Sequence, residues 1–427
     1  MRAVAAAVLT TVVPTVVGRR WISGSEVIRW SLGAVVGVVL VASGGLLGGL
    51  MGSPGTGAVL TSVVGWFIGP HIRWNAGFRP LPSVVRRVLI VLLVAGAALM
   101  VMSLFRPVPS WDAWFLWSLK AKGLASAGSF DSPVFLSPAY AYSSQDYPTL
   151  LPSWQALAYI VSGDLSTSWP LQFQQAWLWT AGAVALVWLA SGYAWLAFLL
   201  PLAWIIAPEI VWQSMQGYAD VPMAIMLVLG AAVLWGNQRD PRSHAIAGVL
   251  LAGAALTKAE GAPLVAIVLA CLLIMRRPKP VLAIAPTIVI AARLPWFVFT
   301  QLHGLTNEMI NPTIVHSLIL GEVPQRWPEI ALTMGSEILS PLRWALLVPA
   351  CILAAVLLRA IDARLAVAAV LGFILFAAVY QATWSFQGST LEAFVRSNVD
   401  RVVIAPLGLL ALSVGAASGK PVGTDPP

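Results

Sequence analysis

The chain has 427 residues, of which 59% are hydrophobic and only 10% are charged. This composition excludes a soluble globular protein, because polar side chains are too scarce to cover a water-facing surface. The net charge of +8 does not indicate a nucleic-acid partner, because many of the basic residues lie in short connections between apolar runs, where they report membrane orientation.

Apolar runs recur along the whole chain, so we expect an all-α polytopic membrane protein with about 11–13 transmembrane helices and extracytoplasmic loops that carry interfacial helices. The predicted spans are residues 3–18, 30–52, 56–70, 88–105, 171–190, 194–207, 221–236, 245–256, 262–275, 281–302, 342–358, 365–384 and 402–415. A cytoplasmic tail is expected over residues 416–427.

Basic residues set the expected orientation in a plasma (inner) membrane. The connection after the third span holds four arginines, at positions 73, 79, 86 and 87, so we place it in the cytoplasm. Alternation from there puts most of the acidic residues on the outer face. Acidic residues contribute little to orientation, so their excess favours an extracytoplasmic active surface; the alternative is that longer outer loops simply collect polar residues.

The first long outer segment, residues 106–170, opens on Asp112, which stands among three tryptophans and is followed by Lys120 and Lys122. Indoles anchor at the lipid headgroup level, a carboxylate can take a proton, and a lysine can hold a lipid phosphate. The alternatives are that Asp112 caps a helix and that the lysines only snorkel. Helical spacing predicts a membrane-facing side made of Trp111, Trp114, Phe115 and Trp117.

Two later runs, residues 245–256 and 262–275, are shorter than the ~17 residues that an unaided crossing needs. The turn between them, residues 257–261, is therefore expected below the outer surface. An irregular, charged turn at that depth is tolerated only when it is buried in protein or lines a watery cavity. We expect an indented outer surface that holds Asp220, Lys258 and Glu260.

Five motifs on the expected outer side occur in a familiar order. They are Trp111-Asp112-Ala113-Trp114, Gln145 to Pro152, Gly217 to Pro222, Leu256 to Gly261, and the segment from Arg396 to Arg401. Their order and side resemble the C-type (GT-C) integral membrane glycosyltransferases, in the branch of the protein O-mannosyltransferases and the aminoarabinose transferases of lipid A. The resemblance covers about residues 106–405. It implies a catalytic domain over 88–415 with outer loops 106–170 and 303–341, preceded by extra helices and a basic cytoplasmic loop in 1–87.

The resemblance implies a transferase that moves a sugar from a polyprenyl-phosphate carrier to a hydroxyl of a lipid, glycan or protein, usually with inversion. One carboxylate must deprotonate the acceptor, and positive charge must stabilise the leaving phosphate. Paired acids of the glycosidase kind are unnecessary, because a phosphate leaves without a general acid. No cofactor is expected with certainty. A divalent cation lacks a clear ligand cluster, because the positions where relatives carry a second acid hold Ala113 and Trp114.

Residue roles carry over position by position. Asp112 matches the first-loop acid and is the expected base. The residues expected to orient substrate are Asp146, Tyr147, Asp220 and Glu260. The residues expected to bind the lipid phosphate are Lys258, Arg293, Arg396, Arg401 and Lys120, with Arg396 preferred to Arg401.

Each of these roles has a structural alternative. Asp146 could form a turn and Asp220 a helix cap. Lys258 could pair with Glu260, Arg293 with a carboxylate, and Arg401 with the neighbouring Asp400. For the whole protein, the alternatives are a transporter or flippase of lipid-linked sugars and an O-antigen polymerase or ligase. A transporter is expected to carry charges near the midplane in paired halves, and neither pattern occurs, so we favour the enzyme.

Overall fold

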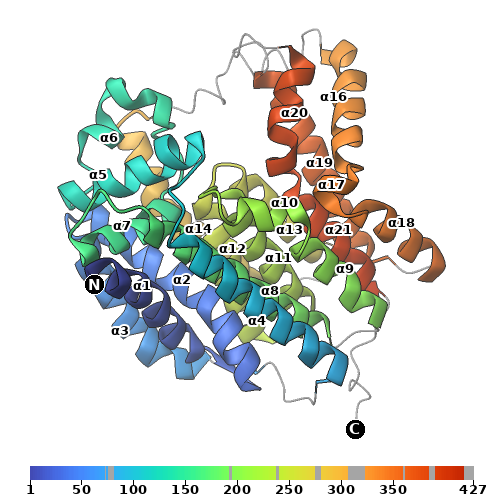
Figure 1. Ribbon diagram of the computed structural model, residues 1–427, viewed down its shortest axis with the longest axis horizontal. Helices are drawn as coiled ribbons and strands as arrows, with labels where there is room; N and C mark the ends of the chain where they lie inside the picture. The colour runs from blue at the N-terminus through green and yellow to red at the C-terminus, as the bar shows by residue number, and fades with distance from the viewer. Residues whose placement is uncertain are drawn as a thin grey trace.

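The computed structural model describes residues 1–72, 74–75, 81–191, 195–236, 240–274, 280–305, 323–358, 361–383 and 390–417. Helices dominate it (Figure 1), and every predicted apolar run coincides with one or two of them. Most of the predicted tail, and the central part of the second outer loop (306–322), lie outside the described residues.

The helices of the first half are α1 (Arg2–Arg19), α2 (Glu26–Leu50), α3 (Pro54–Ile72), α4 (Ser83–Ser103), α5 (Leu119–Ala127), α6 (Pro133–Leu136), α7 (Leu150–Ser162), α8 (Trp169–Ala190), α9 (Trp195–Ile205) and α10 (Pro208–Gln213). The second half has α11 (Asp220–Gly236), α12 (Pro241–Thr257), α13 (Gly261–Ile274), α14 (Ile284–Leu302), α16 (Val323–Ile338), α17 (Pro341–Trp344), α18 (Leu347–Leu358), α19 (Ala363–Thr383), α20 (Leu391–Val402) and α21 (Ile404–Ala417). Three short turns of π or 3₁₀ helix are η1 (Ala113–Ser118), η2 (Pro138–Ser143) and η3 (Pro280–Ala283).

Within the described residues, four helices are long and apolar enough to cross a membrane: α1, α2, α4 and the continuous segment Val281–Leu302. A fifth candidate is the pair α20 and α21, which is bent by 51° at its break. Shorter apolar helices lie within α11, α13, α18 and α19. The molecule is therefore helical, with several apolar helices that could span a bilayer. The run 262–275 is as short as predicted, since α13 has 14 residues, whereas the run 245–256 belongs to the 17-residue α12.

Small residues let α1 and α2 cross closely. A Cβ built on Gly37 would lie 1.7 Å from the Pro14 carbonyl oxygen, and one on Gly18 would lie 1.9 Å from the Gly33 oxygen. Such close helix contacts are typical of packing in lipid, where van der Waals contact replaces the hydrophobic effect.

The basic connections meet at one end of the helical bundle. Residues 22–23 form β1 and residues 74–75 form β2; they pair in parallel, with Ile22 opposite Trp74. This small sheet is a departure from the all-α prediction, and it ties the first basic connection to the second. The far end of α11 lies with another basic connection, because Trp235 Nε1 donates to Asp362 Oδ2 at 2.8 Å.

The predicted first outer segment folds over the opposite end of the bundle as η1, α5, α6, η2 and α7 (Figure 1). Phe130 N donates to the carbonyl of Gly49 at the end of α2. The predicted membrane-facing aromatic side is only partly right, because Trp111 is 71% exposed whereas Trp117 is fully buried. Residues 113–118 form a π-helix, whose i→i+5 hydrogen bonds widen the turn, so α-helical spacing does not apply and Trp117 turns inward to contact Tyr147.

Candidate functional site

Five charged side chains from four distant parts of the chain form one connected group, which we call the charged cluster: Asp112, Asp220, Lys258, Glu260 and Arg401. Arg401 Nη1 lies 2.5 Å from Asp112 Oδ2, and Arg401 Nε lies 3.4 Å from Asp220 Oδ2. Lys258 Nζ lies 2.7 Å from Asp220 Oδ1 and 3.1 Å from Glu260 Oε1. The cluster therefore alternates carboxylate and cation from Asp112 through to Glu260.

The turn that carries Asp220 is docked against the start of η1. Gly217 has a φ of +84°, and a Cβ there would lie 2.8 Å from the Cβ of Ala113, so both the backbone conformation and the space require glycine. Ser110 Oγ donates to Gln216 Oε1 at 2.9 Å. These contacts hold Asp220 beside Asp112, although the two residues are 108 positions apart in the sequence.

Asp112 does not act as a helix cap. Its backbone is already helical, with φ −61° and ψ −34°, and its side chain makes no capping hydrogen bond to η1. The side chain instead turns to Arg401. The Arg401 guanidinium also lies over the Tyr218 ring, with its carbon 4.2 Å from the ring centroid, an arrangement that holds a cation in place through the ring quadrupole.

Lys258 lies just beyond the end of α12, in an extended conformation (φ −148°, ψ 156°). Arg293 supports that end, because its Nη1 donates to the carbonyl of Ala255 at 2.7 Å. Cations that bond the last carbonyls stabilise a helix C-terminus. From the sequence, the expected partner of Arg293 was a lipid phosphate or a carboxylate. The hydrogen bond in the structure goes instead to a backbone carbonyl at the end of α12.

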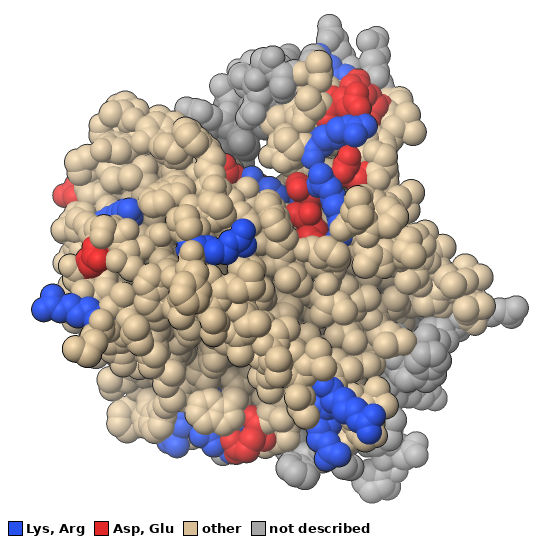
Figure 2. Space-filling model, in the orientation of Figure 1, with Lys and Arg blue, Asp and Glu red and all other residues tan. Residues whose placement is uncertain are grey.

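The exposed fraction of the side chains increases from one side of the charged cluster to the other. Asp220 and Lys258 are buried, whereas the Asp112 side chain is 27% exposed, the largest fraction in the cluster. Burial lowers the pKa of Lys258, but the carboxylates of Asp220 and Glu260 outweigh it, so that pKa lies above its ordinary value. Figure 2 shows acidic and basic side chains side by side down the column formed by α16 and α20 and at the hollow beside its base.

A second polar group adjoins the cluster through Tyr147. Lys120 is fully buried, and its Nζ donates to the carbonyl of Ser144 at 2.5 Å and faces the ring of Tyr147. Burial lowers the pKa of Lys120 to about 7, against the opposing effect of Asp146. The ammonium of Lys120 is thus enclosed by protein and bonded to a backbone carbonyl, unlike the snorkelling side chain that was its structural alternative.

Tyr147 lies between that lysine and the charged cluster. Burial raises the pKa of its phenol, and the negative charges of Glu260, Asp146 and Asp220 raise it further. The phenol is therefore a neutral hydrogen-bonding group at any physiological pH. The backbone of Asp146 is fixed in turn, because its carbonyl accepts from Trp296 Nε1 at 3.0 Å.

The structure places Arg396 away from the cluster. Its side chain is 55% exposed and lies 2.8 Å from Glu392 and 3.6 Å from Glu337. The structural alternative for Arg401 named Asp400 as its partner; instead Asp400 pairs with Arg343 at 2.8 Å, and Arg401 pairs with Asp112 and Asp220. The sequence assigned no role to Tyr218, although this residue belongs to the Gly217 to Pro222 motif, and it did not indicate Arg343; no local signal connects either residue to its partner in the structure.

Among the residues that the structure describes, no group of three His, Cys, Asp or Glu side chains could hold a metal ion. Both cysteines, Cys271 and Cys351, are free thiols. Comparison of the chain with protein-family models, with curated proteins and with solved structures finds no match.

Proposed function

We propose that this protein is a glycosyltransferase that moves a sugar from a polyprenyl phosphate to a hydroxyl acceptor on the extracytoplasmic face of the plasma (inner) membrane. The observation that carries the proposal is the charged cluster, in which the most exposed carboxylate, Asp112, lies directly against a cation, Arg401, that is backed by further buried charges. A carboxylate beside enclosed cations is what transfer from a phosphate donor requires.

In the proposed reaction, an acceptor hydroxyl oxygen attacks the anomeric carbon of the donor. The bond from that carbon to the phosphate oxygen breaks, and the phosphate leaves with the electron pair. Asp112 accepts the hydroxyl proton, which balances the charge. Attack opposite the leaving phosphate inverts the anomeric centre.

Arg401 and Lys258 supply the positive charge for the donor phosphate. A guanidinium binds phosphate through several N–H groups at once. A donor phosphate that reaches Arg401 would compete with Asp112 for its Nη1 hydrogen, which would free the carboxylate to accept the hydroxyl proton. Tyr147, Asp146 and Glu260 border this space and are assigned to substrate orientation. Arg293 is assigned to positioning, because it supports the end of α12 just before Lys258.

The finer topology is part of the proposal: the thirteen apolar runs are embedded in the bilayer, with about 11–13 crossings. Two features support it. The first two basic connections are joined by the pairing of Ile22 with Trp74. The charged cluster lies by α20 and the first outer segment, at the start of α11, whereas the far end of α11 reaches Asp362. Both contacts agree with the proposal that the short basic connections share one side of the bilayer.

The test is transfer by the membrane-embedded protein from radiolabelled undecaprenyl-phosphate hexoses and pentoses to endogenous acceptors. Asp112→Asn should lower transfer by ~10²-fold or more while donor binding persists, because it removes only the base. Asp131→Asn is the matched control, since Asp131 lies exposed in the same outer segment. Near-wild-type turnover of Asp112→Asn would show that Asp112 is not the general base. Donor appearing in the outer leaflet without a new glycosidic bond would support a flippase instead.

A further inference from the structure

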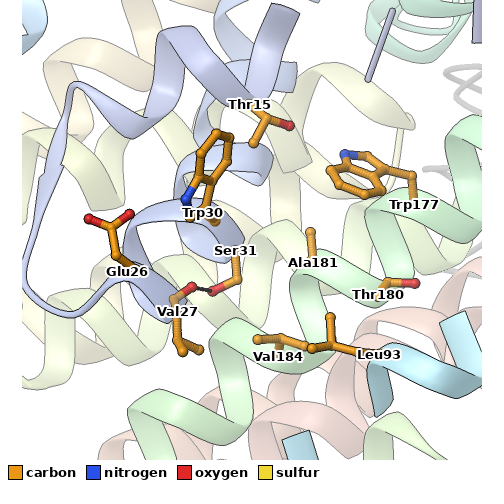
Figure 3. Close-up of a pocket in the computed structure, with 10 residues that line it drawn as sticks. All are labelled: Thr15, Glu26, Val27, Trp30, Ser31, Leu93, Trp177, Thr180, Ala181 and Val184. Carbon is orange, nitrogen blue, oxygen red and sulfur yellow. Dashed lines mark hydrogen bonds between the residues drawn. The ribbon is translucent and has the colours of Figure 1, made fainter. Parts of the chain in front are cut away.

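An apolar cavity lies toward the end of the bundle that carries Arg19 and Glu26, away from the charged cluster. It has a volume of about 420 Å³ and is bounded by α1, α2, α4 and α8. Figure 3 shows Trp30 and Trp177 on either side of it, with Thr15 between them and Leu93, Ala181 and Val184 below. Its size falls within the range of sites that hold small molecules.

The wall of this cavity is mostly apolar, and its polar groups include the carboxylate of Glu26, the indole N–H of Trp177 and three hydroxyls. Each hydroxyl in the wall donates to a carbonyl four residues earlier in its own helix: Thr15 to Thr11, Ser31 to Val27 and Thr180 to Ala176. No hydroxyl hydrogen is therefore left for a polar ligand. The cavity suits a hydrocarbon chain.

The cavity is accessible from the apolar flank of the bundle. Leu93 and Trp30 both line the cavity and are also exposed. The outer face of α4 continues this surface with Ile90, Val91 and Val94, all exposed. An apolar cavity that opens on an exposed apolar helix face is continuous with the lipid tails that such a face contacts.

The mouth of the cavity carries excess positive charge. Glu26, which lines the cavity, pairs with both Arg19 and Arg29. Arg19 also lies over the Trp30 ring at 4.4 Å, and Arg20 over the Trp66 ring. Two arginines thus pair with one carboxylate, which leaves a net positive charge beside the cavity. In the described part of the chain, the Nε atoms of Arg19 and Arg29 are buried and have no hydrogen-bond partner.

We infer that this cavity binds an anionic glycerophospholipid, with one acyl chain between Trp30 and Trp177 and the phosphate at Arg19 and Arg29. The phosphate meets the exposed parts of the Arg19 and Arg29 guanidinium groups, whose side chains are 32% and 24% exposed, and offsets the excess positive charge. The acyl chain fills the apolar space between α4 and the α1–α2 pair. The site is distinct from the charged cluster and does not depend on the glycosyl-transfer proposal.

The experiment measures lipid-dependent thermal unfolding and lipid retention of the full chain in detergent. Phosphatidylglycerol should raise the Tm by several degrees and remain bound in native mass spectra, because binding to the folded state stabilises it. Phosphatidylcholine should give less than half of that shift. Inorganic phosphate and glycerol 3-phosphate, which lack an acyl chain, should give none.

Two variants test the two halves of the site. Ala181→Leu places a side chain in the cavity and should abolish the phosphatidylglycerol-specific shift without lowering the Tm of the delipidated protein. The triple variant Arg19→Gln, Arg29→Gln and Glu26→Gln removes the charges together and should make phosphatidylglycerol and phosphatidylcholine equivalent. Arg86→Gln with Arg87→Gln is the control, since these exposed arginines begin α4 outside the cavity; its shift should match the wild type.

Equal shifts from both lipids in the wild type would overturn the inference, as would full retention of phosphatidylglycerol by both variants. A shift produced by inorganic phosphate alone would mean that the arginines form an anion site without a lipid chain. None of these three outcomes would affect the glycosyl-transfer assay, so failure of the lipid site can be distinguished from failure of the proposed function.

Discussion

Arg401 Nη1 lies 2.5 Å from Asp112 Oδ2, although 289 positions separate the two residues, and the same guanidinium also reaches Asp220 Oδ2 at 3.4 Å. One cation therefore joins α20, the first outer segment and the start of α11. Because Asp220 is completely buried while Asp112 is partly exposed, the guanidinium connects an interior charge to the surface where a substrate could arrive.

The first prediction concerns Arg401. Arg401→Gln should lower transfer by about 10²–10³-fold, the effect of losing one transition-state donor. Arg401→Lys should recover only part of the rate, because an ammonium cannot make the same fork of hydrogen bonds. Initial rates across a donor concentration series would measure both effects. Arg396→Gln is the control on the same helix, where the arginine is exposed; an equal loss in both variants would show that α20 has been disturbed generally.

The second prediction concerns the buried pair of Lys258 and Asp220. Lys258→Met should destabilise the protein by about 3–5 kcal/mol, because it leaves a buried carboxylate with less compensation. Combining it with Asp220→Asn should restore most of the stability. Donor titration of the double variant decides the role of Lys258. Continued weak donor binding by a stable protein supports phosphate binding, whereas recovered donor affinity would make Lys258 a structural partner only.

The apolar pattern predicted most of the helices because burial in lipid or protein needs continuous apolar surface, and this requirement is visible in a single sequence. The same pattern predicted that Asp220, Lys258 and Glu260 share one indentation of the surface. The prediction followed from the short apolar runs beside these residues, which leave the connecting turns below the membrane surface. The structure brings these three into contact.

Other features depend on geometry that composition does not record. Arg396 and Arg401 are five positions apart on one helix and so point to different faces; only the packing of α20 decides which one meets Asp112. Arg293 bonds a backbone carbonyl, and every helix end offers such carbonyls, so the partner could not be named from the sequence. Trp117 turned inward because residues 113–118 adopt a π-helix.

The third prediction concerns the pH dependence of stability at Lys120. Burial lowers its pKa to about 7, against about 10.4 in an unfolded chain. Below about pH 7 the ammonium is charged in both states, and its burial opposes folding. As the pH rises from about 7 toward 10, the folded protein releases a proton that the unfolded chain keeps, so stability increases.

Lys120→Met removes this titration and keeps a side chain of similar length. The Tm of the wild type relative to Lys120→Met should therefore rise between about pH 7 and pH 9. Thermal unfolding of both proteins in the same detergent, at several pH values, measures the difference. A difference that stays constant with pH would mean that Lys120 does not change its protonation in this range.

The last prediction concerns the face on which the charged cluster opens. In a background with Cys271→Ala and Cys351→Ala, Ser126→Cys should react with a membrane-impermeant maleimide added to intact cells, because Ser126 is exposed in the outer segment that carries Asp112. Arg242→Cys, at the exposed start of α12, should react only after the cells are opened, and it leaves intact the Asp240 side chain that caps this helix. A permeant maleimide should label both and so controls for burial. Labelling of Arg242→Cys but not Ser126→Cys from outside would place Asp112 and Arg401 in the cytoplasm. A nucleotide sugar would then replace the polyprenyl phosphate as the expected donor, because nucleotide sugars are cytoplasmic.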